Sequence, residues 1–435
     1  MDRFTRRDLG KLAVAASGAA AAFSLAPFAS AQVKGRVVII GGGPGGATVA
    51  HYIKKNAPQI DVTLVEPSKV YTTCFFANLY LGGFRTFESL NHSYSGLRAL
   101  GVNVVHAHAT DVDTARKTVR LSGGESLRYD KLVLSPGIDL KWESVPGYSA
   151  EAAKSMPHAY LPGAQTQLLK RQLDNMENGG VVAMVMPSGI YRCPPGPYER
   201  MCMIAHFLKT NKPKSKLIVL DPKRTLVSKG ALFKEAFDKY YSGIIEHHLT
   251  DDFDDFAVER IDVKTQEIKA KSGMTVKAAV ANVIPSQRAG RIVFRAGVTD
   301  GDWCPINPGD FSSTKVKDVY VLGDASKAGQ MPKSGFSANN QAKSVASAIE
   351  TELAGKRRFP PRYRNTCWSM LAPDDSVKVG ANYKADDLSA FEGFISKVGE
   401  DAALRKRTFE ESLAWYDGIT ADTFAEGAKP ARQKG

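Results

Sequence analysis

The sequence predicts an α/β fold with two parallel sheets, and three apolar runs are the basis for this prediction. Residues 37–40, 181–185 and 319–322 are short and rich in β-branched or apolar side chains, which is typical of strands buried on both faces. Each run precedes a glycine- or proline-rich loop and then a probable helix, the order found in parallel β–α–β units. With 435 residues, 43% of them hydrophobic, the chain is long enough for two or three domains with full cores.

A glycine-rich loop follows the first strand. Gly41, Gly43 and Gly46 fit the pattern G-x-G-x-x-G, with Pro44 between them, and the loop leads into a helix predicted over 47–55. In this pattern the first glycine permits a tight turn, the second lets the backbone approach a pyrophosphate, and the third lets helix and strand pack closely. The N-terminus of the helix then presents free N–H groups and a positive dipole to the phosphates.

An acidic residue completes this first motif. A second predicted strand, 62–65, ends in Glu66, twenty positions after Gly46. A carboxylate at this place can accept hydrogen bonds from ribose hydroxyls and would repel a 2′-phosphate. Strand, loop, helix, strand and acid together predict a dinucleotide site, against the alternative of a glycine-rich loop that binds no nucleotide.

The strand at 319–322 leads into a second candidate cofactor element. Gly323 and Asp324 follow it directly. In flavoproteins with two dinucleotide domains, an aspartate at this strand end bonds the ribityl chain and phosphate of FAD. The other interpretation of Asp324 is an ordinary turn at a strand end.

A helix predicted over 336–353 would direct its N-terminus toward the flavin, where its positive potential would stabilise an anionic reduced ring. The segment 134–137 indicates a crossover back into the FAD domain. The remaining residues that we expect to bind FAD lie just before that helix and in that crossover. They are Lys333, Ser334, Gly335, Ser135 and Gly137.

A cysteine stands where many related reductases have a second glycine motif. The loop after strand 181–185 contains Cys193 among three prolines and a glycine, and Glu199 lies on the probable helix that follows, 198–209. A site for NAD(P)H would need G-x-G-x-x-G here, and the pattern is absent. The sequence therefore indicates a reductase framework with a different electron source, and it disfavours an NAD(P)H-dependent disulfide reductase.

The N-terminus predicts export. Arg6 and Arg7 form a twin-arginine pattern, an alanine-rich stretch covers 12–28, and residues 29–31 fit a cleavage site for a signal peptide. The twin-arginine route carries folded proteins, which suits a flavin loaded in the cytoplasm, so we expect a periplasmic protein. The alternative is a membrane anchor.

The net charge of the chain limits the classes of macromolecule that we expect as partners. The net charge is +13, and removal of four basic and two acidic side chains with residues 1–31 leaves +11. Nucleic acid is not a periplasmic partner, so the excess charge favours an acidic protein partner or is simply a solvated basic surface. The chain has no C-x-x-C-H motif and binds no covalent haem of its own. We predict no metal site.

The chain has five cysteines, and in an oxidising compartment such as the periplasm cysteines can form disulfides. An odd number leaves at least one unpaired or otherwise bonded. Cys202 lies between Met201 and Met203 and is most simply a buried core thiol, and Cys304 has no role that the sequence supports. The remaining three are Cys74, Cys193 and Cys367.

The whole mature chain resembles the flavoprotein subunit of flavocytochrome c sulfide dehydrogenase. The cysteine-loop and C-terminal motifs are specific to that family, whereas the glycine motif is widespread. The segments that resemble the family are residues 41–46, 71–78, 192–200, 333–340, 365–367 and 415–420.

The resemblance implies a chemistry. Cys74 would hold FAD through an 8α-S-cysteinyl bond, Cys193 and Cys367 would form a redox-active disulfide beside the flavin, and Glu199 would act as an acid/base near the thiols. The enzyme would oxidise sulfide to sulfur or polysulfide and pass electrons to a di-haem c-type cytochrome subunit. We expect no stable insertion in a membrane.

The resemblance also implies a glutathione-reductase-like architecture with two dinucleotide-binding domains. The FAD domain, split in sequence, would comprise 32–150 and 286–355, and the second nucleotide-domain-like unit would comprise 151–285. A C-terminal domain, 356–435, would supply Cys367 and the partner interface. Short strand-like runs around Gly123-Gly124 predict a meander within 102–129.

Two further functions remain open. A sulfide:quinone reductase would use the same dithiol and flavin but a membrane acceptor, and it usually has an amphipathic C-terminus, whereas charges such as Arg405-Lys406-Arg407 interrupt the C-terminal segment here. A non-enzymatic flavin- or cytochrome-binding protein would not need Cys193, Cys367 and Glu199. Bleaching of the flavin by sulfide, and the choice of acceptor, separate these functions.

Overall fold

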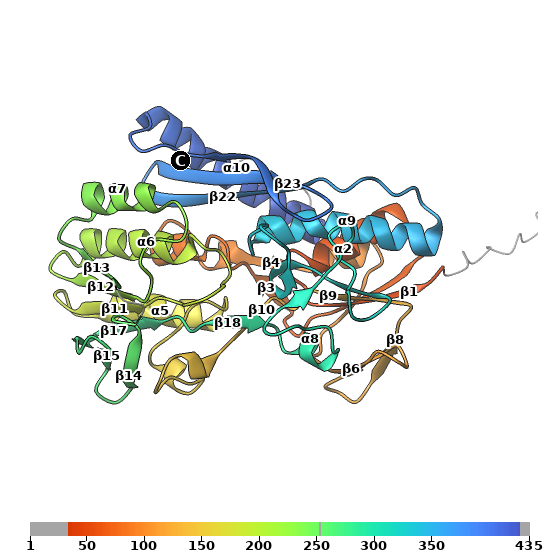
Figure 1. Cartoon of the computed structure of the whole chain (residues 1–435), viewed down its shortest axis with the longest axis horizontal. Coiled ribbons are helices and arrows are strands. Elements are labelled where there is room, and N and C mark those ends of the chain that lie inside the picture. Colours follow the sequence, from red (N-terminus) through yellow and green to blue (C-terminus); the bar gives the residue numbers. More distant parts are fainter. Residues whose placement is uncertain (1–33, 252–253, 427–435) are drawn as a thin grey trace, which may run out of the picture.

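The protein has two α/β units side by side with a C-terminal layer over both, in a computed structural model that describes residues 34–251 and 254–426 (Figure 1). The predicted signal peptide, residues 1–31, lies outside the described residues. In Figure 1 the first unit is on the right, the second unit is on the left, and the C-terminal elements lie along the top.

The first unit contains a five-stranded parallel sheet. Its elements are β1 (Arg36–Ile40), α2 (Gly46–Asn56), β2 (Asp61–Val65), β5 (Asn103–Val105), β9 (Lys131–Leu134), β20 (Val319–Val321) and α9 (Gly335–Ala354). The strand order is β20-β9-β1-β2-β5, with parallel pairing throughout. The predicted strands and helices of this unit are confirmed to within one residue at either end. Because β20 comes from a segment nearly two hundred residues after β9, the unit is split in sequence.

Smaller elements surround this sheet. A three-stranded antiparallel meander of β6, β7 and β8 lies within the predicted range 102–129, and this prediction is confirmed. The small elements are β3 (Val70–Thr72), α3 (Ala77–Leu81), β4 (Asn91–Ser93), α4 (Ser95–Ala99), β6 (Ala109–Asp113), β7 (Thr118–Leu121), β8 (Ser126–Arg128), α8 (Ile292–Arg295), β19 (Cys304–Pro305) and β21 (Ser326–Lys327).

The second unit repeats the pattern with a four-stranded parallel sheet. Its elements are α5 (Ala164–Asn175), β11 (Val181–Val185), α6 (Gly196–Asn211), β12 (Lys216–Asp221), α7 (Gly230–Tyr240), β13 (Ile245–Leu249), β14 (Val258–Asp262), β15 (Glu267–Ala270), β16 (Thr275–Lys277) and β17 (Val280–Val283). The parallel order is β13-β12-β11-β17, and β14, β15 and β16 form an antiparallel meander. An antiparallel pair of β10 (Ile138–Leu140) and β18 (Gln287–Ala289) joins the two units.

The C-terminal layer consists of an antiparallel sheet, β22 (Tyr363–Ala372), β23 (Asp375–Tyr383) and β24 (Ala390–Ile395), with the long helix α10 (Ala402–Phe424). Strand β22 packs against α6 and α7 of the second unit and against α9 of the first. The layer therefore bridges both units and brings β22 over the junction between them.

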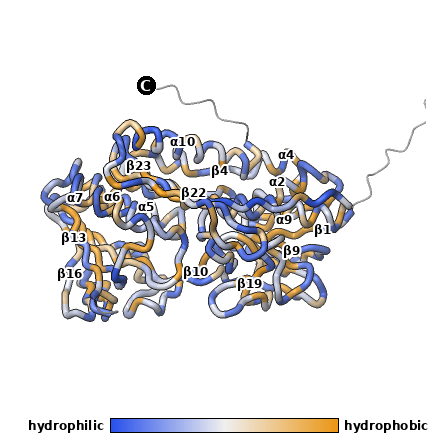
Figure 2. Tube along the Cα trace, turned by 45° about the horizontal axis from the view of Figure 1, so that its top comes forward, coloured by the Kyte–Doolittle hydropathy of each residue, from blue (hydrophilic) through white to orange (hydrophobic). Residues whose placement is uncertain are grey.

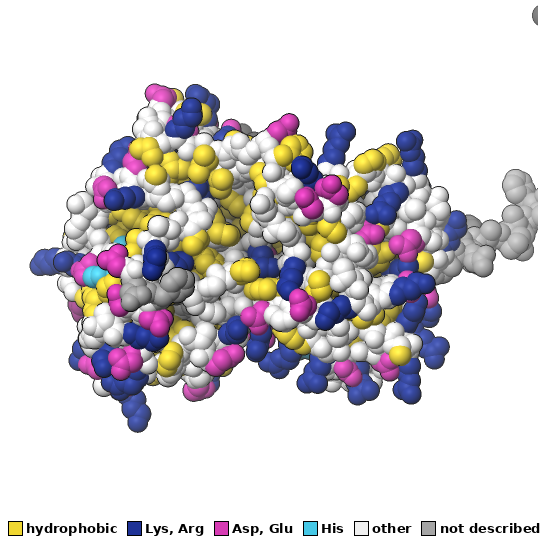
Figure 3. Space-filling model, viewed as in Figure 1, with side chains coloured by type: hydrophobic (Ala, Val, Ile, Leu, Met, Phe, Trp, Pro, Cys, Tyr) yellow, Lys and Arg dark blue, Asp and Glu magenta, His cyan; other side chains and the backbone are white. Residues whose placement is uncertain are grey.

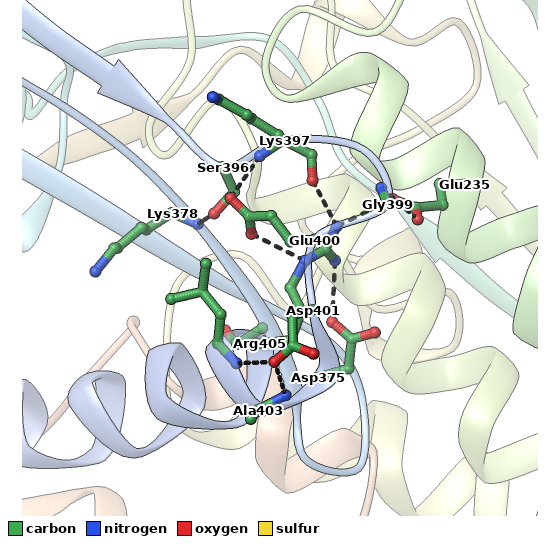
Figure 4. Close-up of polar contacts among 12 residues, drawn as sticks. Glu235, Asp375, Lys378, Ser396, Lys397, Gly399, Glu400, Asp401, Ala403 and Arg405 are labelled. Atoms are coloured by element: carbon green, nitrogen blue, oxygen red, sulfur yellow. Dashed lines mark hydrogen bonds and ion pairs between the residues drawn. The ribbon is translucent and has the colours of Figure 1, made fainter.

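A buried arginine fixes this layer to the second unit (Figure 4). The guanidinium of Arg405 on α10 contacts Glu235 on α7 at 3.0 Å, Asp375 on β23 at 3.1 Å and Glu400 at 3.0 Å. Asp401 caps α10 by accepting a hydrogen bond from the N–H of Ala403. Removal of one partner from such a buried cluster leaves an uncompensated charge, so the contacts strongly favour one position of the layer.

The core lies mainly along the two sheets, and Figure 2 shows hydrophobic stretches along β1 and β9. Lys and Arg side chains are interspersed with Asp and Glu over the face in Figure 3 and gather at its right-hand end. Among residues 34–251 and 254–426, no helix has the length and apolar character needed to cross a membrane.

Candidate functional site

Two adjoining hollows lie where the three parts of the molecule meet. The dinucleotide cavity is lined by the glycine loop, Glu66 and Asp324, and the thiol cavity is lined by Cys193, Glu199 and Cys367. Because their linings overlap, the two hollows share one wall and adjoin. The residues common to both linings are Cys74, Pro162, Arg192, Ser334 and Gly335.

The glycine loop leaves no space for side chains at two of the predicted positions. Gly41 has a φ of +104°, and a Cβ there would lie 2.2 Å from the carbonyl oxygen of Ser135. A Cβ at Gly46 would lie 2.0 Å from the carbonyl oxygen of Gly41. These contacts require glycine, and they hold the backbone at the edge of the cavity in the form that a pyrophosphate needs.

Most of the predicted FAD-binding residues line the dinucleotide cavity. The lining includes Gly41, Gly43, Pro44, Glu66, Cys74, Ser135, Gly137, Gly323, Asp324, Ser334 and Gly335. Gly46 lies behind the loop, where it permits close packing of α2 on β1.

Two acids give this cavity its polar character. The carboxylate of Glu66 accepts hydrogen bonds from the N–H groups of Gly42 and Ser68, both at 2.9 Å, and so holds the glycine loop to the end of β2. Burial raises the pKa of Asp324, whose carboxylate lies 3.8 Å from the guanidinium of Arg192. Two carboxylates in the lining of a glycine-rich cavity fit the hydroxyl groups of a flavin dinucleotide.

Lys333 is the predicted residue whose side chain does not line the site. Its ammonium group donates hydrogen bonds to the carbonyl oxygens of Asp324 and Ser326, each at 2.7 Å, and lies 3.8 Å from the centre of the Trp303 ring. Its backbone carbonyl accepts a hydrogen bond from the N–H of Cys193 at 2.8 Å. Lys333 therefore ties the cysteine loop of the second unit to the first unit.

The thiol cavity brings together two cysteines that are far apart in the sequence. Cys193 lies in the loop before α6 with a φ of +56°, a left-handed conformation that costs a non-glycine residue about 1–2 kcal/mol. Cys367 lies on β22 of the C-terminal layer. Both are free thiols in this structure, and burial is the main factor that raises the pKa of each.

Glu199 lies in the first turn of α6 with its carboxylate in the same cavity. Its oxygens accept hydrogen bonds from the Nδ2 of Asn78 at 2.8 Å and from the N–H of Met370 at 2.9 Å. Burial raises its pKa, while these donors and the cations Lys229 and Arg200 oppose the rise. An acid with a raised pKa beside two thiols is suited to receiving and returning a proton.

Cys74 lines both hollows at their junction and is a free thiol here. Burial raises its pKa, and the guanidinium of Arg192 partly offsets that effect.

The other two cysteines, Cys202 and Cys304, line neither hollow. Cys202 is fully buried on α6, which confirms its prediction as a core thiol, and Cys304 is fully buried on β19.

Sequence reasoning missed several residues that line the thiol cavity, and it missed Lys229, which does not line the cavity but contacts the backbone of Cys367. It lies just before α7, and its ammonium group donates to the carbonyl oxygen of Cys367 at 3.0 Å and to the hydroxyl of Ser369 at 2.7 Å. No motif marks this lysine, because only the docking of the C-terminal layer brings it to Cys367. The missed residues that line the cavity are Asn78, Arg192, Arg200, Trp368 and Trp415.

Three family models match successive parts of the chain. A model of the central part of the sulfide dehydrogenase (flavocytochrome c) flavoprotein chain matches residues 166–285, and a model of the flavin-binding part of flavocytochrome c sulphide dehydrogenase matches 359–424. A pyridine nucleotide-disulphide oxidoreductase model matches 35–174. Together with the glycine-lined cavity, these matches identify a flavoprotein that binds FAD.

Individual relatives fall into two groups. The chain is 56% identical over 43 residues to the sulfide dehydrogenase (flavocytochrome c) flavoprotein chain of Chlorobaculum thiosulfatiphilum, which is 10% of this chain and 90% of that sequence. It is 22% identical over 413 residues to the sulfide-quinone reductase of Aquifex aeolicus, covering 90% and 93% of the two chains. Matches to the mitochondrial sulfide:quinone oxidoreductases of Dictyostelium discoideum and Mus musculus, each 22% identical, span 65% of those proteins, just under two thirds of their length.

Solved structures confirm the predicted fold class. The sulfide:quinone oxidoreductase of Aquifex aeolicus superposes with a TM-score of 0.67 at 20% identity, over 90% of this chain and 92% of that one. Putidaredoxin reductase in its covalent complex with putidaredoxin gives 0.63 at 16% identity, over 92% and 100%. By its family models and its 56% identical relative, the chain belongs to the family of flavocytochrome c sulfide dehydrogenase flavoprotein chains.

Proposed function

We propose that this protein oxidises sulfide at the Cys193–Cys367 pair and, through FAD, delivers the electrons to a c-type cytochrome. One observation carries the proposal: thiols from two different parts of the fold line one hollow that adjoins the dinucleotide cavity. A hydride donor such as NADH would need a second glycine loop after β11, and the chain has Cys193 there.

The chemistry of the thiol pair begins from a disulfide between Cys193 and Cys367. Hydrosulfide attacks one Sγ atom, a new S–S bond forms, the Sγ–Sγ bond breaks, and its electron pair leaves on the other cysteine as a thiolate. The product is a persulfide on one cysteine and a thiolate on the other. Glu199 takes up the proton of the persulfide or returns one to the thiolate, since its raised pKa lies closer to neutrality than that of an exposed acid.

FAD, when bound, supplies an acceptor for an electron pair that can also release electrons singly. The residues that would hold it are those of the dinucleotide cavity, with the glycine loop for the pyrophosphate and Glu66 and Asp324 for hydroxyl groups. Cys74 lies where the two hollows join, a place consistent with a thioether bond to the flavin ring. Acid precipitation would then leave the yellow colour in the protein pellet, and in a Cys74→Ala variant the flavin would be released.

The cytochrome partner is supported by the two family-specific models, whose descriptions name flavocytochrome c. Apolar side chains suited to an interface are exposed on and after β24: Phe391, Phe394, Ile395 and Val398. A di-haem cytochrome over the C-terminal layer, and export to the periplasm under the direction of Arg6 and Arg7, belong to the same proposal. Lys replacement of both arginines should leave the precursor in the cytoplasm.

A second candidate is a sulfide:quinone reductase, favoured by the Aquifex aeolicus relative that matches over 90% of this chain. The experiment that decides is anaerobic turnover with sulfide, with a c-type cytochrome or a water-soluble quinone as acceptor. We expect cytochrome reduction in the wild type, loss of it in Cys367→Ser, and retention in Cys304→Ala, whose cysteine is buried away from the site. Fast quinone reduction with no cytochrome reduction would transfer the function to the second candidate.

A further inference from the structure

We propose that Lys229 is an electrostatic positioning residue that directs the negative charge to Cys367 when the disulfide opens, so that the persulfide forms on Cys193. The inference deepens the proposed function and rests on it. It concerns the choice between the two sulfurs, which the family descriptions and the cavity alone leave open.

The Lys229 side chain is buried against β22. The residue is 4% exposed, and its ammonium group spans from the start of α7 to β22, where it donates to a carbonyl oxygen of Cys367 and to the hydroxyl of Ser369. Both acceptors are neutral. Within residues 34–251 and 254–426, no carboxylate forms a direct ion pair with this ammonium group, and Glu199 raises its pKa only from a longer distance. A buried cation without a direct ion pair is costly, and an anion that appears beside it is stabilised.

The two sulfur atoms differ in their hydrogen bonds. The Nδ2 of Asn365 donates a hydrogen bond to the Sγ of Cys367 at 3.2 Å. The orientation of that amide is fixed, because its Oδ1 accepts hydrogen bonds from the hydroxyls of Ser334 at 2.6 Å and Ser337 at 3.2 Å. No hydrogen bond to the Sγ of Cys193 is found within the described part of the chain. Cys367 therefore has a fixed donor that Cys193 lacks. Lys229 lowers the pKa of both thiols, but it is the largest influence on Cys367 after burial and the smallest of the resolved influences on Cys193.

The charged and titratable groups that face Cys367 agree with this assignment. Lys229 and the side chains of Asn365 and Ser334 lower its pKa, and Glu199 from α6 raises it. Cys193 and Tyr383 also interact electrostatically with Cys367. On the α10 side, Glu411 is engaged by Lys378 at 2.5 Å and by the indole of Trp368. Lys229 has a pKa lowered to about 8 by burial, so its charge is available below that pH and is lost as the pH rises through it.

The step balances in atoms and electrons. Hydrosulfide bonds to the Sγ of Cys193, the Sγ–Sγ bond breaks, and its electron pair remains on Cys367 as a thiolate. The cysteine with the lower thiol pKa is the better leaving group, so stabilisation of the Cys367 thiolate directs the attack to Cys193. No external oxidant takes part in this exchange.

The test is the pH dependence of alkylation in the full-length, flavin-containing protein after reduction, without sulfide. Iodoacetamide reacts with thiolates, and peptide mass mapping gives the midpoint pH separately for Cys193 and Cys367. In the wild type we expect the lower midpoint at Cys367. In Lys229→Gln its midpoint should rise by about one unit or more, which is about tenfold less thiolate at a fixed neutral pH.

Two matched variants separate charge from support of the strand. Lys229→Arg keeps the cation and should keep the midpoint near that of the wild type. Ser369→Ala removes one hydrogen bond of Lys229 but leaves its charge, and it should shift the midpoint little. Equal shifts in Ser369→Ala and Lys229→Gln, an unchanged midpoint in Lys229→Gln, or failure of Lys229→Arg to restore it would each overturn the proposal.

A second measurement uses only the wild type and decides even if Lys229→Gln does not fold. After one equivalent of sulfide is added anaerobically to oxidised protein, the persulfide should map to the Cys193 peptide, and a persulfide on Cys367 would contradict the inference. If sulfide does not react at all, the proposed function fails, while the alkylation midpoints still decide the role of Lys229.

Discussion

The loops that follow β1 and β11 occupy the same place in two similar units but present opposite kinds of surface. The loop at residues 41–45 is five residues long and approaches the cavity with backbone, since Gly41 and Gly46 have no room for a side chain. The loop at residues 186–195 is twice as long and presents a side chain, the thiol of Cys193, in a left-handed conformation. Both loops lead into a helix that begins with glycine, α2 and α6.

This difference shows that the sheet topology determines where a ligand or reactant binds. The sequence of the loop determines which chemical groups contact it. Ligands of open α/β sheets bind beyond the carboxyl ends of the strands. One such end here offers N–H groups and a helix dipole for phosphates, and the other offers sulfur. The C-terminal layer then adds the second sulfur, from β22, which neither sheet could supply.

The largest effect is expected when Cys193, in the loop after β11, is substituted. Cys193→Ser should slow reduction of the flavin by sulfide about a thousandfold or more, because the disulfide that sulfide attacks no longer exists. The flavin content should stay near that of the wild type, since the glycine loop is intact. Anaerobic stopped-flow absorbance measures both quantities. Rapid bleaching in this variant would place the entry of electrons elsewhere.

The next effect is expected at the glycine loop. Gly41→Ala places a Cβ 2.2 Å from the carbonyl oxygen of Ser135 at a φ of +104°, so the loop must shift and flavin loading should fall severalfold. Gly189→Ala is the matched control in the cysteine loop, because its φ is also positive, at +70°, but no atom lies within 4 Å of the added Cβ. That control should cost only about 1 kcal/mol of strain. Equal flavin-to-protein absorbance ratios in the two variants would contradict the assignment of the glycine loop.

Substitution of Glu199 tests whether this residue transfers protons in the thiol cavity. In Glu199→Gln the amide oxygen still accepts one hydrogen bond but holds no proton, so the rate of sulfide oxidation should fall about a hundredfold. Burial raises the pKa of Glu199 above the usual 4.5, so the wild-type rate should decline with falling pH from a pH above that value, as the carboxylate becomes protonated. The pH–rate profile of the variant should lack this decline. If the decline persists unchanged, another group titrates there.

The smallest effect concerns the surface rather than the loops. The net charge of +11 after signal removal should attract an acidic cytochrome, so the rate of sulfide-driven cytochrome reduction should fall severalfold between low and high salt. Sulfide bleaching without an acceptor should be insensitive to salt, which makes it the internal control. A salt-independent rate would remove electrostatic steering and leave the chemistry untouched.

The sequence predicted those elements whose signal is local. The strands at 37–40, 62–65 and 181–185 are predominantly apolar, and their loops contain the residues that their backbones require, so β1, β2 and β11 lie where expected. Helix α6 begins at Gly196, two residues before the predicted start, because the proline-rich loop already has helical backbone geometry at Pro195.

The rest depends on contacts between distant segments. Cys193 and Cys367 are brought to one cavity by the docking of β22, and only the family resemblance, not the spacing, suggested that they pair. Lys229 has no local signal, since one lysine among many becomes special only when it is buried against β22. Lys333 follows the Gly323-Asp324 motif in sequence, and its side chain was expected to bind FAD. Its ammonium group instead donates to the carbonyl oxygens of Asp324 and Ser326. Its backbone carbonyl accepts a hydrogen bond from the N–H of Cys193.

The central claim is that the loop after β11 admits electrons from sulfide rather than from a nicotinamide. Its most direct test is a pair of anaerobic titrations of the flavin-containing protein, one with sulfide and one with NADH, followed by the visible absorbance of the flavin. We predict bleaching by about one equivalent of sulfide and no bleaching by NADH on the same timescale. Bleaching by NADH as fast as by sulfide would contradict the account, because it would show that the cysteine loop has not replaced the nucleotide site.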